Sequence, residues 1–165
     1  MTVKRCIFVV LLVIAPALAI GGPETAEHRY LVETFGDYGA AVERCERLKY
    51  EQPAPDHQTL AALNSYGIDD NRVFLVGREY HLSDQCTKDE LLSLLLAVMS
   101  LQSADLEPVT QQALEGIRGM VFSDNRWHLE KQYRALPAEM KKTLEALPYF
   151  QTPFDSLSVI DRLED

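Results

Sequence analysis

The sequence predicts an all-α protein: an irregular, orthogonal bundle of about five to seven helices, stapled by one disulfide and preceded by a cleaved signal peptide. Three observations lead to this prediction. Apolar residues recur at helical spacing along most of the chain. Proline, glycine and capping residues divide it into short segments. A single stretch, 73–76, has strand character, and an isolated strand is not stable.

Residues 1–19 are predicted to be an export signal. Two basic residues precede an apolar run, and small residues occupy the alternate positions Ala17 and Ala19. The apolar run is about fifteen residues long, whereas a membrane-spanning helix needs roughly 20. We therefore expect cleavage after Ala19, with Ala17 as the alternative, and no membrane anchor afterwards. The product would be a single helical domain, 20–165, in the periplasm or secreted to the medium.

The three cysteines indicate one disulfide. Cys6 lies within the predicted signal, so the exported domain retains Cys45 and Cys86, an even pair in an oxidising compartment. No C-x-x-C spacing points to redox chemistry, and two sulfur ligands do not complete a zinc site. We expect Cys45 and Cys86 to be bonded, and we predict no metal and no cofactor.

The charge of the chain restricts its partners. The full sequence has a formal net charge of −9, and without the predicted signal 14 basic and 25 acidic residues remain, a net charge of −11. Such a surface repels nucleic acid and anionic lipid and favours basic partners. Nucleic-acid binding is therefore excluded from the functions considered.

The first helix is expected over residues 24–51. Gly36 and Gly39 lie inside it, and because each costs about 1 kcal/mol relative to alanine, we expect another helix to approach closely there. Residues spaced by three and four positions define the predicted core face of this helix: Leu31, Phe35, Tyr38, Val42 and Cys45.

Two shorter segments follow. Asp56 is a natural N-cap for a short helix that stops at Gly67. Residues 68–85 are predicted to form an irregular turn followed by a helical piece that delivers Cys86 to Cys45.

The most strongly marked helix is expected to start at Thr87, since residues 87–90 match the capping box. Residues 91–101 are apolar on nearly every face, which predicts a centrally buried helix. The rest of the chain or a second copy must cover these faces, so a homodimer is an alternative to a monomer.

Start signals also mark the remaining helices. Pro108 fits the first turn of one helix, Ser123 can cap the next over 124–136, and Pro137 opens another. A final helix is expected to start at Thr152, with its hydroxyl as the N-cap.

Catalytic and metal-binding patterns are absent from the sequence. The four histidines, at positions 28, 57, 81 and 128, never fall three or four residues apart, and no H-E-x-x-H occurs. There is no G-x-S-x-G or S-x-x-K to mark a nucleophilic serine. The sequence therefore favours a non-enzymatic protein and provides no catalytic residue.

Two patches are candidate binding sites. In the helix 124–136, Trp127 lies about 200° around the axis from Leu129, so it should point away from the buried face. An outward tryptophan among cations resembles a protein-interface hot spot. The patch predicted to bind a partner is Arg126, Trp127, His128 and Arg134. The second patch, next to the predicted disulfide, is Arg72, Arg78, Tyr80 and His81.

These observations favour an exported, non-enzymatic helical protein that binds another protein of the envelope or the extracellular space. One concrete form is an inhibitor or immunity protein that blocks a basic cell-wall enzyme by charge complementarity. A small hydrolase is the first alternative, and it would need an acid of raised pKa beside His81 or His128. A carrier is the second, and it would need an apolar cavity lined by residues 91–101.

Overall fold

The computed structural model describes residues 25–164 and confirms the all-α prediction. The predicted signal peptide and both candidate cleavage positions lie outside this range. Seven helices are eight residues or longer, and one seven-residue helix and one 3-10 turn accompany them. In chain order the elements are α1 (Ala26–Glu51), α2 (His57–Leu63), α3 (Ile68–Cys86), α4 (Lys88–Leu101), α5 (Pro108–Val121), α6 (Asp124–Ala135), α7 (Ala138–Glu145), the 3-10 turn η1 (Pro148–Gln151) and α8 (Ser156–Glu164).

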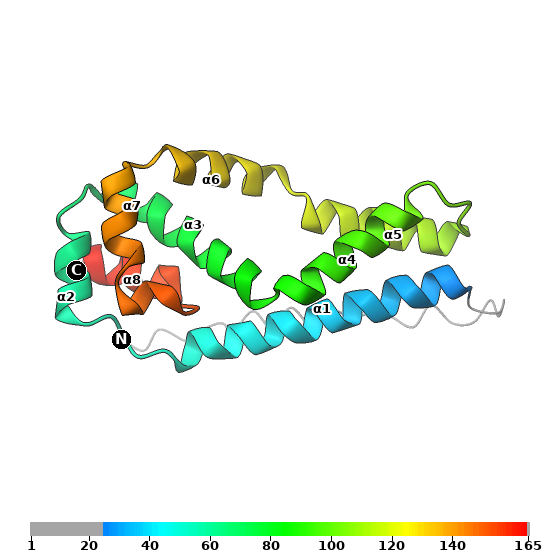
Figure 1. Cartoon of the computed structure of the whole chain (residues 1–165), viewed down its shortest axis with the longest axis horizontal. Coiled ribbons are helices and arrows are strands. Elements are labelled where there is room, and N and C mark those ends of the chain that lie inside the picture. Colours follow the sequence, from blue (N-terminus) through cyan, green and yellow to red (C-terminus); the bar gives the residue numbers. More distant parts are fainter. Residues whose placement is uncertain (1–24, 165) are drawn as a thin grey trace, which may run out of the picture.

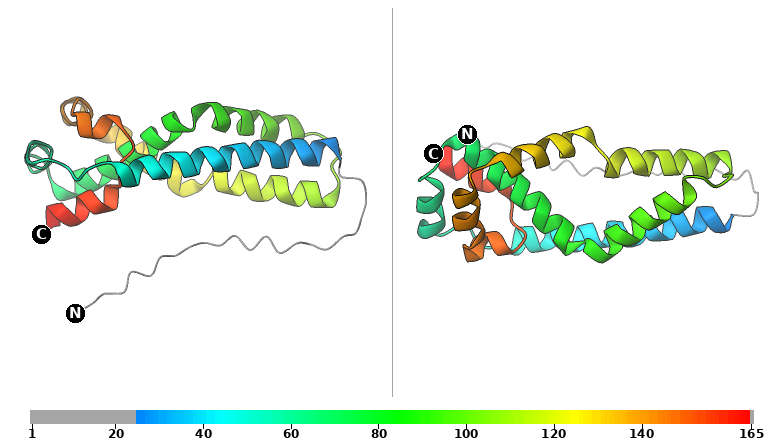
Figure 2. Two further views of the ribbon diagram at one scale, coloured as in Figure 1. Left: turned by 90° about the horizontal axis from the view of Figure 1, so that it is seen from below. Right: turned by 45° about the horizontal axis from the view of Figure 1, so that its top comes forward.

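Helices α3 and α4 form a V that shapes the molecule (Figure 1). The point of the V lies at Thr87 beside α1, and α5 and α6 lie along its open side. At one end α1, α4 and α5 pack together, and each of the three contacts the other two (Figure 2). The buried residues of this first core are Leu31, Leu94, Val98, Leu101, Leu114 and Ile117.

A second core lies at the other end of the molecule, where α2, α7, η1 and α8 gather around α3 and the end of α6 (Figure 1). It is rich in aromatic rings, and the rings of Phe74 and Phe150 meet edge to face with their centroids 5.2 Å apart. Because α3 helps to build this core and leads directly into α4, the V connects the two cores.

The predicted disulfide is confirmed. Cys45 of α1 and Cys86 at the end of α3 are bonded, with their Cα atoms 6.1 Å apart. Beside it, Arg44 and Glu90 form an ion pair of 3.0 Å between α1 and α4. The point of the V is therefore fixed to α1 by a covalent bond and an ion pair.

The irregular turn predicted at the start of residues 68–85 was wrong, because the whole segment forms one continuous helix, α3, which does bring Cys86 to Cys45. This helix contacts α1, α4, α6 and α8, so apolar residues are needed on several of its sides. Contact on many sides removes the one-sided periodicity by which an amphipathic helix is recognised. The apolar residues 73–76 are therefore part of a helix that is packed on several sides, and they do not form a strand.

The helix starts were predicted with mixed success. Asp56 does cap α2, since its Oδ1 accepts a hydrogen bond of 2.7 Å from the backbone N–H of Thr59. Pro108 is the first residue of α5. The capping box at Thr87 does not form, because the Thr87 hydroxyl donates instead to the carbonyl of Ser83 at 3.0 Å. Thr87 is the residue between two consecutive helices, and its side chain completes the earlier one.

Two further starts differ in detail. Ser123 occupies the N-cap position of α6, but its side chain makes no capping hydrogen bond. The last helix begins at Ser156 and not at Thr152. There Asp155 Oδ1 accepts a hydrogen bond of 3.1 Å from the N–H of Leu157. The Asp155 carboxylate therefore has the capping role that was predicted for the Thr152 hydroxyl.

Two packing predictions were also wrong. A Cβ added at Gly36 or Gly39 would meet nothing within 4 Å, so no helix approaches them closely. Close approach occurs instead at Gly77 of α3, where an added Cβ would lie 2.8 Å from Cγ of Tyr133. The α3–α6 contact is thus the one that requires a glycine.

Helix α4 is buried on one side only, contrary to the prediction of central burial. Leu94 and Val98 face the first core, whereas Leu92, Leu96 and Met99 are exposed. Within residues 25–164, no helix combines the length and apolarity that crossing a membrane demands.

Candidate functional site

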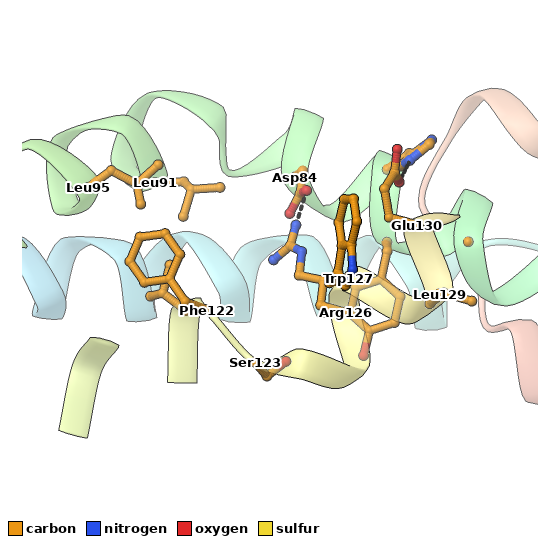
Figure 3. A pocket seen from close by; sticks show the side chains of 13 residues that line it. Asp84, Leu91, Leu95, Phe122, Ser123, Arg126, Trp127, Leu129 and Glu130 are labelled. Carbon is orange, nitrogen blue, oxygen red and sulfur yellow. Dashed lines mark hydrogen bonds and ion pairs between the residues drawn. The ribbon is translucent and has the colours of Figure 1, made fainter. Parts of the chain in front are cut away.

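A groove of about 590 Å³ lies inside the V, between α3, α4 and the junction of α5 with α6 (Figure 3). We call it the aromatic groove. Its lining includes Tyr80, His81 and Asp84 of α3, Leu91 and Leu95 of α4, and Phe122, Arg126, Trp127, Leu129 and Glu130 of the α5–α6 region. The angle between α3 and α4 separates the lining residues of these two helices. The α5–α6 region places its own lining residues opposite both.

The apolar walls of the groove are largely open to solvent. Leu91 and Leu95, one helical turn apart on α4, face Phe122 across the groove (Figure 3). Phe122 and Trp127 are 59% and 63% exposed, large values for aromatic side chains. Trp127 therefore points away from the buried face of α6, as its position in the sequence predicted.

Two polar contacts join α3 to α6 at the groove. Arg126 forms an ion pair with Asp84, and its guanidinium lies over the Tyr80 ring, 5.7 Å from the centroid. The second contact is a hydrogen bond of 2.7 Å between His81 Nε2 and Glu130 Oε2. Arg126 and His81 are thus each held by a carboxylate of the same chain, and the two contacts help to fix the distance between the walls of the groove.

The environment of Glu130 lowers its pKa. The hydrogen bond from His81 is the largest cause, and the hydrogen bond that Arg134 Nε donates to Glu130 Oε1 at 2.5 Å is the next. The hydrolase hypothesis required the opposite, an acid of raised pKa beside His81. This carboxyl is therefore suited to holding charge, and it is a poor general acid.

The lowered pKa makes the contribution of Glu130 to stability pH-dependent. A carboxyl whose pKa is lower in the folded state stabilises the fold above its ordinary pKa of 4.5 and loses that effect as the pH falls through its folded value. We expect Glu130→Gln to lower the free energy of unfolding by about 1 kcal/mol at pH 7 and by much less at pH 3. Urea unfolding at both pH values measures this, with Glu43→Gln, an exposed position on α1, as the control. An equal loss at both pH values would contradict it.

The structure unites parts of the two predicted patches. Arg126 and Trp127 from the first and Tyr80 and His81 from the second all line the aromatic groove. Arg134 lies outside the lining but hydrogen-bonds to Glu130, which does line it.

The other three predicted residues lie elsewhere. Arg72 forms an ion pair with Glu164 of α8, and Arg78 Nε donates to the carbonyl of Phe150 at 2.8 Å. Both tie α3 to the second core. His128 is exposed on α6 and does not line the groove.

Apart from Trp127 and Tyr80, no apolar residue of the groove was placed in a binding patch from the sequence. Leu91 and Leu95 were assigned to a buried helix, and Phe122 was not assigned to either patch. The signal for the α4 wall was present, because residues 91–101 are apolar all round, but it led to a homodimer or a ligand cavity as alternatives and not to a groove shared with Trp127.

A second pocket, of about 610 Å³, adjoins the groove on the other side of α3, between α1 and the start of α8. Tyr80, Asp84 and Arg126 line both cavities. In the second pocket Lys49 forms ion pairs with Glu46, at 3.0 Å, and with Glu79. Burial opposes the charge of Lys49, but the two hydrogen-bonded carboxylates outweigh it and raise its pKa.

Among residues 25–164, no three histidine, cysteine or acidic side chains are grouped so that they could hold a metal ion. The chain matches no model of a known protein family. Neither the curated proteins nor the solved structures contain a significant match to it.

Proposed function

We propose that this chain is an exported, non-enzymatic binding protein whose aromatic groove receives part of another protein of the envelope or extracellular space. The observation that carries the proposal is the pairing of two largely exposed aromatic side chains, Phe122 and Trp127, with an apolar wall on α4. Soluble proteins seldom leave contiguous apolar patches larger than a few hundred Å² open unless a partner covers them.

The composition of the groove resembles that of a binding hot spot. Tryptophan, tyrosine and arginine contribute most to the energy of protein interfaces, and Tyr80, Arg126 and Trp127 occur together here. The ion pair and the ring contact hold Arg126 in place, so little side-chain freedom remains to be lost on binding.

The charge of the molecule supports a basic partner. With a formal net charge of −9, the chain attracts basic proteins over a distance and accelerates their encounter at low salt. An inhibitor or immunity protein of a basic cell-wall enzyme is one concrete form of this function. An inhibitor of a cell-wall enzyme must be exported. The Cys45–Cys86 bond supports export, because disulfides persist in oxidising compartments.

A carrier of an apolar ligand is the second candidate, because the groove is lined by Leu91 and Leu95 of the leucine-rich helix. Its openness favours the first candidate. Small-molecule sites bury roughly 70–90% of the surface of their ligand. In this groove the lining side chains Phe122 and Trp127 are themselves largely exposed to solvent.

The test is affinity capture from an envelope extract with the purified protein and with Trp127→Ala. We expect a specific basic partner that binds at low salt and is lost in the variant, since truncating a hot-spot tryptophan weakens binding by roughly 30-fold or more. Tyr30→Ala removes an exposed aromatic residue of α1 outside the groove and should retain the partner. If Trp127→Ala binds as well as the parent protein, the groove is not the binding surface.

A further inference from the structure

We infer that the occupant of the aromatic groove is a cationic amphipathic helix of the partner protein, lying along the open side of α4. This inference rests on the proposed function and names the class of segment that the groove receives. Three observations carry it: the apolar stripe on α4, the absence of a strand edge near it, and the excess of carboxylates around the groove.

The apolar stripe continues the groove along α4. Leu95 lines the groove, and Leu92 and Met99 lie next to it on the helix surface, three and four residues away; Leu96 is in turn four residues from Leu92 and three from Met99. All three are half exposed or more, and Leu96 is 63% exposed. No charged residue occurs from Leu91 to Leu101. This spacing presents a seam of about two helical turns on the side of α4 opposite to its core face.

A helix suits this surface better than an extended segment. An extended peptide satisfies its backbone hydrogen bonds by adding to the edge of a sheet, and residues 25–164 contain no strand. A helix satisfies its own backbone groups, so it can lie against apolar side chains without burying unpaired polar atoms. One large side chain from such a helix would enter the groove between Phe122 and Leu95, beside Trp127.

The charges around the groove select a cationic helix. The aromatic groove is lined by two carboxylates and one cation, Arg126, and the second pocket on the other side of α3 adds three carboxylates and Lys49. The acidic residues are Glu46, Glu79, Asp84, Glu130 and Asp155. Lysines or arginines on the polar face of the helix would compensate this excess of carboxylates. A second copy of this acidic chain would add to it, which disfavours a homodimer through this face.

The chain contains its own reporter, because Trp127 is the only tryptophan in the sequence. It is largely exposed in the free protein, so a segment that covers it should shift its fluorescence to shorter wavelength. The probe is a synthetic peptide about as long as α4, held helical by a side-chain lactam. It carries leucines at i, i+3, i+4 and i+7, one phenylalanine, and lysines elsewhere.

We expect saturable binding of this peptide with a blue shift of Trp127 emission. Leu96→Glu places a charge in the exposed stripe and should weaken binding roughly tenfold or more. Val109→Glu is the matched control, because Val109 is 57% exposed on α5 and lies outside the groove, and it should bind like the parent protein. Glu46→Gln, which reduces the excess charge while Glu79 still pairs with Lys49, should weaken binding by a smaller factor.

Two control peptides separate this inference from the proposed function. If a version with glutamate in place of lysine binds equally well, the groove receives a helix but the cationic class is wrong. If a scrambled peptide of the same composition binds equally well, charge alone acts and the helix in the groove is wrong.

Two further results would overturn the inference. One is a blue shift that grows with protein concentration without peptide, together with a dimer in sedimentation, because a second copy would then occupy the groove. The other is no binding of the cationic helix while envelope capture still depends on Trp127, which would leave the proposed function intact and exclude this class of segment.

Discussion

Removing the disulfide with Cys45→Ala and Cys86→Ala together is expected to lower the free energy of unfolding by about 4 kcal/mol. The bond closes a loop of about 42 residues, and the chain-entropy model assigns that loop a cost of this size in the unfolded state. Single domains have net stabilities of roughly 5–15 kcal/mol, so the variant would lose a large share of its stability and should unfold at a lower urea concentration. Urea unfolding followed by circular dichroism measures the loss.

Reduction provides the control for this prediction. A thiol reductant should destabilise the parent protein by a similar amount and leave the double variant unchanged. Because the bond fixes the point of the V to α1, the reduced protein should also bind its partner less well, even where it remains helical. A loss below about 1 kcal/mol in the double variant would contradict the chain-entropy account.

Gly77→Ala is expected to destabilise the fold by about 3 kcal/mol through overpacking. The added Cβ would lie 2.8 Å from Cγ and 3.0 Å from Cβ of Tyr133, which are not the flexible end of a side chain. The Tyr133 ring cannot easily move, because it is buried, stacks on Phe74, and its hydroxyl donates to Glu145 Oε1 at 2.7 Å. Burial and the nearby Glu145 carboxylate also raise the pKa of Tyr133.

The matched control is Gly36→Ala in α1. Nothing lies within 4 Å of the added Cβ there, so the better helix propensity of alanine should stabilise the protein by up to about 1 kcal/mol. The same substitution in two helices should thus have opposite effects on the urea midpoint. Combining Gly77→Ala with Tyr133→Ala should cost less than the sum of the two single changes, because the clash is removed. Strict additivity would refute the proposed contact.

Local signals predicted most of the secondary structure and failed where a residue serves two elements. Asp56 and Pro108 have a single local role, and each was placed correctly. Thr87 matches a capping box, but it ends α3 as well as starting α4, and its hydroxyl goes to the earlier helix. Residues 68–85 were misread because α3 is packed on several sides, which hides its period.

The glycines also show that local sequence signals do not reveal tertiary contacts. The penalty of a glycine within a helix is visible in the sequence, but its reason is not. Gly36 and Gly39 drew attention because the pattern around them was clear, yet no neighbour approaches them. Gly77, in the segment that was misread, is the one that another element requires, and only the position of Tyr133 reveals it.

The sequence by itself determined the all-α class, the pairing of Cys45 with Cys86 and the outward direction of Trp127, because each depends on periodicity along one helix or on a count of residues. Only the tertiary structure decided that two separate patches share one groove and that α4 keeps an open apolar side. Those facts depend on the angle between α3 and α4 and on the position of α6 along the open side of the V. That angle results from long-range packing, which no local pattern in the chain encodes.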